Sequence, residues 1–443
     1  MTRAAGQLAR RLGAFDATMI VMGGIIGGGI FVNPAEVARR VGSPGLATLA
    51  WVIGGVIALI GAFVYAELAA RRPEVGGQYA YLRDAYHPVV AFLYGWTLLL
   101  VVQTGGMAAA AMIFGRYAQE LTGIMAPESL IAVVTLLSLT VVNCVGVRAG
   151  SNVQSFFMIS KLAVIAAVVF AGLFLFNGRV PASPPAATAP AGAGIGLMTA
   201  LVPILFTYGG WQTASFVSGE MRNPAVDLPR GLIAGVIGVV VVYLLVNTAF
   251  LAALGVGGLA ASRAPASDVM RAVFGDAGAR FIGAGVALST IGFLSQSMLT
   301  APRVYYAMAR DGVFFSKIGE LGERSRVPVA AIVLQGICAS AIALIGRFDQ
   351  VLNYVVSIDV LFFGLTGAAL LVFRARAADG SKVPISVPLH PFSTILFVAA
   401  CWAIAITVVA SAPRSAGGGV VILLLGVPVY LFWRRARRSS PTG

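Results

Sequence analysis

An apolar span near the start of the chain contains the stretch Gly23-Gly24-Ile25-Ile26-Gly27-Gly28-Gly29-Ile30-Phe31. A second apolar span, about 180 residues further on, contains Phe206-Thr207-Tyr208-Gly209-Gly210-Trp211. Glycine runs favour a break in a helix, and a break at membrane depth leaves backbone N–H and C=O groups that lipid cannot satisfy. Such breaks persist where they line a cavity or hold a ligand. A pair of them at corresponding positions of two halves indicates the binding site of a secondary transporter.

The composition is that of an integral membrane protein. Hydrophobic residues make up 58% of the 443 residues, charged residues make up 11%, and the mean hydropathy is +0.90. This composition predicts an all-α protein with most of its mass in the lipid bilayer. Apolar runs of about 18 residues or more predict twelve spans, at residues 17–38, 45–69, 87–115, 128–148, 153–176, 196–219, 230–254, 277–308, 328–346, 350–373, 393–411 and 417–433.

The positive charges predict how the chain is oriented. The formal net charge is +14. With a cytoplasmic N-terminus, 21 of the 31 Lys and Arg residues fall in cytoplasmic segments and nine fall in the opposite segments. This bias follows the positive-inside rule, so we expect a multi-pass protein of the cell (plasma or inner) membrane with both termini in the cytoplasm. The same distribution argues against nucleic acid as a partner.

The order of the spans predicts two inverted halves within a single membrane domain that comprises the whole chain. A Pro- and Ala-rich linker at 177–194 separates the first five spans from the rest. The broken spans open the two halves, at about 17–176 and 196–373, and spans at about 393–433 are additional. Because five is odd, the second half enters the membrane from the opposite side. These features predict a 5+5 inverted repeat in which the first and sixth spans are discontinuous.

The two breaks differ in the chemical groups that they expose. Free N–H groups at Gly27–Gly29, at the start of a following half-helix, suit a substrate carboxylate. Free carbonyls before Gly209 suit a substrate ammonium. A ligand with both groups is an amino acid, so we expect a substrate site formed by Ile26, Gly27, Gly28, Gly29, Phe206, Thr207, Tyr208 and Gly209. The alternative is that the glycines only allow close helix packing.

The aromatic residues Phe206, Tyr208 and Trp211 cluster at the second break. We expect Phe206 and Trp211 to act as gates over the substrate. Packing in the bundle core is the alternative for each ring, because that is where aromatic side chains of a membrane bundle are usually found.

Two ionisable residues lie well inside predicted spans. Lys161 is in the fifth span and Asp359 is in the middle of the tenth. Such residues are costly in the membrane and mark functional sites by default. We expect both to take part in coupling, with the Lys161 ammonium standing where a cation would otherwise bind. Snorkelling of Lys161 to the interface and structural pairing of Asp359 are the alternatives.

The sequence gives no sign of an enzyme, a metal site or a cofactor. The two histidines, His87 and His390, are far apart and have no carboxylate or cysteine near them at ligand spacing. The three cysteines, Cys144, Cys338 and Cys401, all fall in predicted spans and suit small apolar roles.

Several motifs resemble those of the amino acid–polyamine–organocation superfamily of permeases, above all its L-type amino acid transporter branch. The resemblance covers roughly residues 13–375 and rests on 24–31, Tyr65-Ala66-Glu67-Leu68, Gly76-Gly77-Gln78-Tyr79-Ala80-Tyr81, 206–211, Glu220-Met221-Arg222-Asn223-Pro224 and Phe363-Gly364-Leu365-Thr366. It implies a LeuT-type fold and sodium-independent amino acid transport. It also implies that Gly27–Gly29 form the carboxylate site, that Phe206 is the gating aromatic and that Lys161 replaces a sodium site.

Three features depart from the family pattern. Gly28 stands where the family usually has serine, so a hydroxyl contact is lost while backbone donors remain. The third span has Gln103-Thr104-Gly105-Gly106 where animal relatives carry bulkier polar residues. The outer segment 115–127 has no cysteine, so the disulfide to a heavy chain that is typical of animal members is not expected.

Together these features predict a transporter for neutral amino acids that works by alternating access. Exchange and proton-coupled uptake are both compatible with the sequence. A cationic amino acid or polyamine permease is the alternative within transport, and it would need a carboxylate such as Asp359 at the site. A sensor that binds amino acids without moving them is the other alternative.

Overall fold

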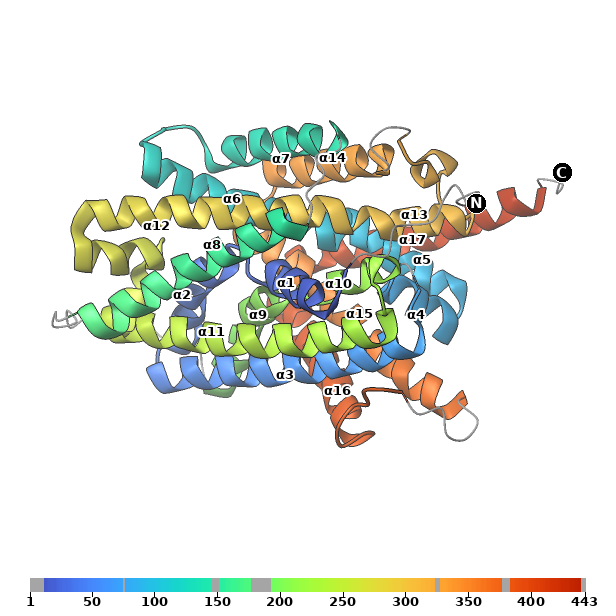
Figure 1. Cartoon of the computed structure of the whole chain (residues 1–443), viewed down its shortest axis with the longest axis horizontal. Coiled ribbons are helices and arrows are strands. Elements are labelled where there is room, and N and C mark those ends of the chain that lie inside the picture. Colours follow the sequence, from blue (N-terminus) through green and yellow to red (C-terminus); the bar gives the residue numbers. More distant parts are fainter. Residues whose placement is uncertain are drawn as a thin grey trace.

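The computed structural model describes residues 12–74, 76–145, 151–176, 193–322, 327–376 and 383–439. Over these ranges the protein is helical, without β-strands (Figure 1). One isolated β-bridge joins Leu12 to Met221. The all-α prediction is therefore confirmed for the described part of the chain.

The helices of the first half follow the predicted spans. They are α1 (Ala14–Ile25), α2 (Gly29–Val41), α3 (Pro44–Arg71), α4 (Gln78–Ala85), α5 (Pro88–Thr97), α6 (Gln103–Thr122), α7 (Glu128–Val145) and α8 (Ser151–Phe170). Single π-helical turns, η1 (Leu98–Val102) and η2 (Ala171–Leu175), join α5 to α6 and extend α8.

The second half and the C-terminal helices follow in the same way. They are α9 (Ala193–Tyr208), α10 (Thr213–Phe216), α11 (Pro224–Ala261), α12 (Pro265–Thr300), α13 (Pro302–Arg310), α14 (Val329–Ile345), α15 (Phe348–Arg376), α16 (Phe392–Ser411) and α17 (Pro413–Ser439). Short 3-10 turns are η3 (Ser218–Glu220) and η4 (Ser316–Gly319). Gly255 and Gly275 have non-helical backbone and bend α11 and α12. Both helices continue beyond these bends, so most of the connection between the two spans is helical.

Nine helical segments of the described chain are long and apolar enough to cross a membrane. The pair α1 and α2, bent by 46°, makes a tenth. Two shorter apolar helices lie at Glu128–Cys144 and Val329–Ile345. Each of the twelve predicted spans overlaps one of these segments. The structure thus establishes a multi-pass membrane protein, and the full count of twelve crossings stays a prediction.

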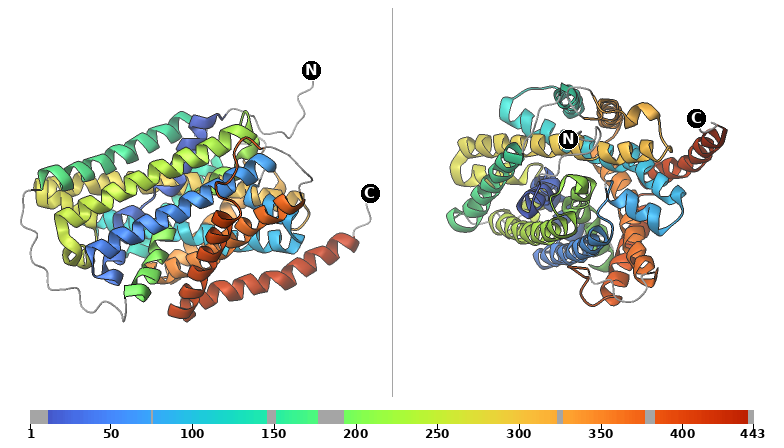
Figure 2. Two further views of the ribbon diagram at one scale, coloured as in Figure 1. Left: turned by 90° about the horizontal axis from the view of Figure 1, so that it is seen from below. Right: turned by 45° about the vertical axis from the view of Figure 1, so that its right-hand side comes forward.

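The broken helices lie at the centre of the bundle. In Figure 1, α1, α9 and α10 are surrounded by longer helices, and Figure 2 shows α3, α8 and α11 running side by side along the molecule. The helices on either side of the first break pack against their neighbours: α1 against α11 and α8, and α2 against α9 and α11. Helices before and after the linker also contact one another: α2 contacts α9, α3 contacts α11, α6 contacts α12 and α7 contacts α14.

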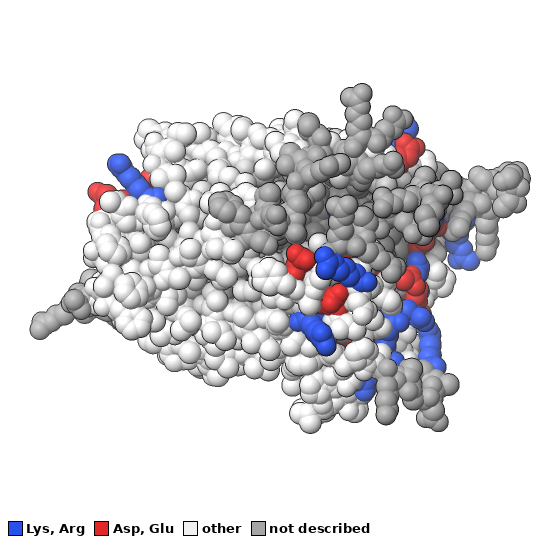
Figure 3. Space-filling model, viewed as in Figure 1, with Lys and Arg blue, Asp and Glu red and all other residues white. Residues whose placement is uncertain are grey.

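Charged side chains gather toward the two ends of the bundle. Figure 3 shows such groups toward both ends of one face, with a wide uncharged area between them. At one end Glu67, which is fully buried, pairs with Arg71 at 2.8 Å and Arg374 at 2.5 Å. At the other end Glu36 pairs with Arg39 and Arg40. This separation agrees with the apolar length of the helices.

The Glu67 cluster joins three segments that are distant in sequence. One carboxylate oxygen of Glu67 accepts a hydrogen bond from Val387 N–H at 2.8 Å, in addition to the two arginines. The cluster therefore ties α3, α15 and the segment before α16 together. Removing the buried carboxylate would take from two partly buried arginines the counter-ion that Glu67 supplies, which is costly.

We predict that E67Q lowers the unfolding temperature in detergent by several degrees, because Arg71 and Arg374 then lose the negative charge of Glu67 at a cost of about 2–4 kcal/mol. The matched control is E74Q. Glu74 pairs with Arg83 at 2.8 Å but is half exposed, so its loss should leave the melting temperature nearly unchanged. Equal melting of the two variants in a thermal unfolding assay would contradict this account.

Candidate functional site

The first break exposes N–H groups at a helix start. The helix α1 ends at Ile25, and Ile26 has an extended backbone (φ −74°, ψ 91°). Gly28 is the residue before α2, and within the described chain its N–H donates no hydrogen bond. Gly29 and Ile30 occupy the first helical turn, where N–H groups have no intrahelical acceptor. These groups and the positive end of α2 form a site that suits an anion.

Lys161 donates hydrogen bonds to backbone carbonyls at the first break. Its Nζ donates hydrogen bonds to the carbonyls of Ile26 at 2.9 Å and Gly23 at 3.3 Å. The side chain is only 2% exposed, so the snorkelling alternative does not hold. Lys161 thus reaches from α8 to the unwound backbone behind the cavity and satisfies oxygens that would otherwise be buried without donors.

The second break exposes a carbonyl at a helix end. The helix α9 ends at Tyr208, and Gly210 has φ +113°. The N–H of Gly210 donates a hydrogen bond to Oε1 of Gln212 at 3.0 Å. The carbonyl of Phe206 consequently accepts no hydrogen bond within the described residues. A free carbonyl at the negative end of a helix suits a cation such as an ammonium.

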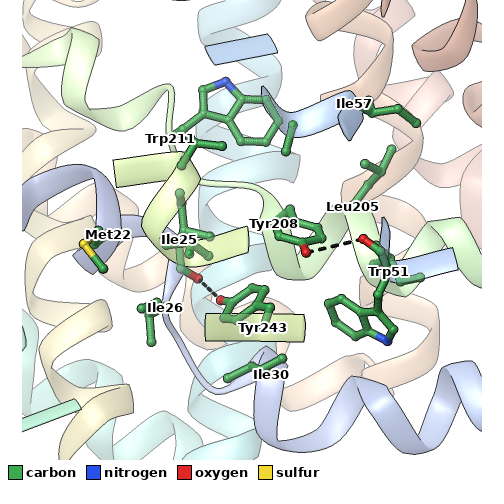
Figure 4. Packing of buried hydrophobic residues seen from close by; sticks show 14 of the residues in the cluster. Met22, Ile25, Ile26, Ile30, Trp51, Ile57, Leu205, Tyr208, Trp211 and Tyr243 are labelled. Atoms are coloured by element: carbon green, nitrogen blue, oxygen red, sulfur yellow. Dashed lines mark hydrogen bonds between the residues drawn. The ribbon is translucent and has the colours of Figure 1, made fainter. Parts of the chain in front are cut away.

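The two breaks touch each other. A Cβ on Gly210 would clash with the carbonyl oxygen of Gly24, so only glycine allows this approach. The hydroxyl of Tyr243, on α11, donates to the carbonyl of Ile25 at 3.0 Å (Figure 4) and lies 3.3 Å from that of Thr207. One tyrosine therefore bridges the unwound backbone of both broken helices.

A side-chain contact between α2 and α9 adds to this bridge. Asn33 donates to the hydroxyl of Thr207 at 2.7 Å and to the carbonyl of Pro203 at 3.2 Å. Both side chains are buried. The relative position of the two breaks is therefore fixed by hydrogen bonds on both sides of the contact.

Between the breaks lies a cavity of about 80 Å³. The predicted site residues that line it are Gly27, Gly28, Gly29, Phe206, Thr207, Gly209 and Asp359. Three other predicted residues, Ile26, Tyr208 and Trp211, are not part of its lining, and neither is Lys161. The structure therefore brings together the glycines of both breaks and the carboxylate of Asp359.

Tyr208 and Trp211 point away from this cavity. Tyr208 packs against Trp51 and Tyr243, with ring centroids 5.6 and 5.1 Å apart, and its hydroxyl lies 3.4 Å from the carbonyl of Trp51 (Figure 4). Trp211 stacks on Phe363 at 4.8 Å, and Phe363 does line the cavity. Of the three clustered aromatic residues, only Phe206 lines the cavity.

The model of the amino acid permease family matches residues 12–430. The chain belongs to this family. The large neutral amino acids transporter small subunit 2 of Mus musculus is 33% identical over 443 residues, covering 96% of this chain and 82% of that protein. The serine/threonine exchanger SteT of Bacillus subtilis (strain 168) is 30% identical over 436 residues, covering 98% of each. The b(0,+)-type amino acid transporter 1 of Mus musculus is 31% identical over 400 residues, covering 88% and 81%.

Sequence reasoning missed one wall of the cavity. This wall comes from α12 and contains Phe293, Gln296, Ser297 and Thr300. The signal was present, because three polar residues at helical spacing mark one face of an otherwise apolar span. The ring of Phe293 lies directly opposite the first break, at 3.3 Å from the position of a Cβ on Gly27.

We predict that G210A abolishes transport and lowers stability by about 1–3 kcal/mol, because the methyl group would push the two breaks apart at a left-handed backbone position. The control is G417A, on α17, where an added Cβ meets nothing within 4 Å. Melting temperature and amino acid uptake are measured for both. Wild-type behaviour of G210A would show that the contact between the breaks is not required.

Proposed function

We propose that this protein is a sodium-independent exchanger of small neutral amino acids that binds its substrate between the two helix breaks. The observation that carries the proposal is the cavity with free N–H groups of Gly28 and Gly29 on one side and the free carbonyl of Phe206 on the other. These groups complement the carboxylate and the ammonium of an α-amino acid.

The size of the cavity favours a small substrate. A volume of about 80 Å³ holds roughly five to eight waters, which is room for an amino acid with a small side chain such as alanine, serine or threonine. The name of the Bacillus subtilis relative, a serine/threonine exchanger, agrees with this size and favours exchange over proton-coupled uptake.

We infer that Phe206, which is partly exposed at the cavity wall, closes over the bound substrate. In this proposal Trp211 supports the gate through its stack on Phe363.

Independence from sodium rests on Lys161. Carbonyls of unwound helices coordinate sodium in transporters of this architecture. Here the Lys161 ammonium donates to two such carbonyls, those of Gly23 and Ile26. We infer that the fixed charge takes the place of the ion, which gives Lys161 the coupling role expected from the sequence.

For the whole chain we propose the LeuT-type arrangement of twelve spans in a 5+5 inverted repeat. Its support is that four helices of the first half each pack against the helix at the equivalent place in the second half. The repeats would comprise about 17–176 and 196–373, with additional spans at about 393–433. We further propose that both termini are cytoplasmic, and that the protein works in the cell membrane without a disulfide-linked heavy chain.

Counterflow into proteoliposomes tests the function. Vesicles preloaded with unlabelled alanine, serine or threonine should take up the same labelled amino acid, and replacing sodium by choline should not change the rate. Empty vesicles should take up little. Accumulation in empty vesicles driven by a proton gradient would contradict exchange, and binding without any movement would identify a sensor.

We predict that K161A and K161M slow transport by about tenfold or more, because two buried carbonyls lose their donor and the break loses its fixed shape. K161M is the more informative variant, since it keeps most of the packing volume. Size-exclusion profiles show whether the variants are folded. Wild-type transport rates in folded K161M would rule out the role given to the ammonium.

A further inference from the structure

Asp359 is a carboxylate without a partner in the middle of an apolar helix. It lies on α15, and within the described residues its side chain makes no hydrogen bond and no ion pair. By contrast, Glu67, the buried carboxylate at one end of the bundle, is held by two arginines and a backbone N–H. An unpaired carboxylate in a span is costly, so its position calls for a ligand.

The position of Asp359 relative to the second break is specific. The point where a Cβ on Gly209 would lie is 3.1 Å from the carbonyl oxygen of Leu205, which accepts the N–H of Gly209, 3.4 Å from the carbonyl oxygen of Phe206 and 3.9 Å from Oδ2 of Asp359. The carbonyl of Phe206 is the one without a donor. Two free oxygens, one of them a carboxylate, therefore face the same small volume beside Gly209.

We propose that the Asp359 carboxylate is the counter-ion of the substrate α-ammonium and binds it together with the carbonyl of Phe206. This inference rests on the proposed function. An ammonium carries three donors in a tetrahedral arrangement and can bridge two such oxygens. The ion pair adds a charge-assisted hydrogen bond to what the helix end alone provides.

The placement distinguishes this role from recognition of a cationic side chain. Asp359 shares its volume with the carbonyl at the end of α9, which is the expected place of the α-ammonium. Lys161, the charged residue at the first break, lies outside the cavity lining and donates to backbone carbonyls, so it does not neutralise Asp359. The ligand class is therefore amino acids with a free α-ammonium. A hydroxy acid or an N-acetylated amino acid would leave the carboxylate unpaired.

The test compares wild type, D359N and a control, S357A, by equilibrium binding to purified protein in nanodiscs. Ser357 lies on the same helix, outside the cavity lining, and its hydroxyl bonds to the carbonyl of Tyr354. The probes are L-alanine, L-serine, L-lactate, N-acetyl-L-alanine, L-arginine and putrescine. Melting without ligand shows whether each variant is folded.

We expect D359N to bind L-alanine and L-serine about 10- to 100-fold more weakly than wild type, and S357A to bind them unchanged. The preference for L-alanine over L-lactate should shrink in D359N. A second variant, G209A, adds a methyl group to the wall between the Phe206 carbonyl and Asp359, which narrows the proposed ammonium site, and should weaken binding of the same probes.

Two results would overturn the inference alone: D359N binding of L-alanine within twofold of wild type, or loss of L-arginine and putrescine binding with L-alanine unaffected. The second result would assign the carboxylate to a side-chain ammonium. Absence of amino acid binding by the wild type would instead overturn the proposed function together with this inference.

Discussion

The structure depends on the contact between two stretches of unwound backbone inside the bundle. Each break by itself would leave polar groups exposed to an apolar environment. Where Gly24 meets Gly210, the two breaks lie close enough for one hydroxyl, that of Tyr243, to reach the carbonyls of both. The cost of interrupting two helices is thus offset in one place.

Around this contact, polar groups divide into those that are satisfied by the protein and those that are left for a ligand. Lys161 and Tyr243 bind backbone groups of the breaks from outside the cavity lining, and Gln212, which is part of the lining, accepts the N–H of Gly210. The N–H of Gly28, the carbonyl of Phe206 and the carboxylate of Asp359 have no partner in the described chain. In the proposed account, a zwitterion supplies the missing partners, and its ammonium meets a full negative charge as well as a helix end.

Much of the fold could be predicted from the sequence because apolar length and glycine runs are local signals. The breaks at Gly27–Gly29 and Gly209 were predicted from glycine runs within apolar spans, and the structure ends α1 and α9 there. The orientation of the individual rings was not predicted. Successive helical residues are about 100° apart, so neighbours in the sequence point in different directions. Phe206 and Tyr208 therefore face opposite sides of α9, and the cluster seen in the sequence is divided between cavity and core.

Contacts between distant segments were beyond sequence reasoning. Lys161 was recognised by its depth, but its acceptors are 135 and 138 residues away in the chain. Tyr243 gave no signal, since a tyrosine in an apolar span looks like any packed aromatic. A structure with bound L-alanine or L-serine tests the central claim most directly. The account predicts the carboxylate within hydrogen-bonding distance of Gly28 N–H, and the ammonium between the Phe206 carbonyl and Asp359. A ligand bound elsewhere, or bound in the reverse orientation, would contradict it.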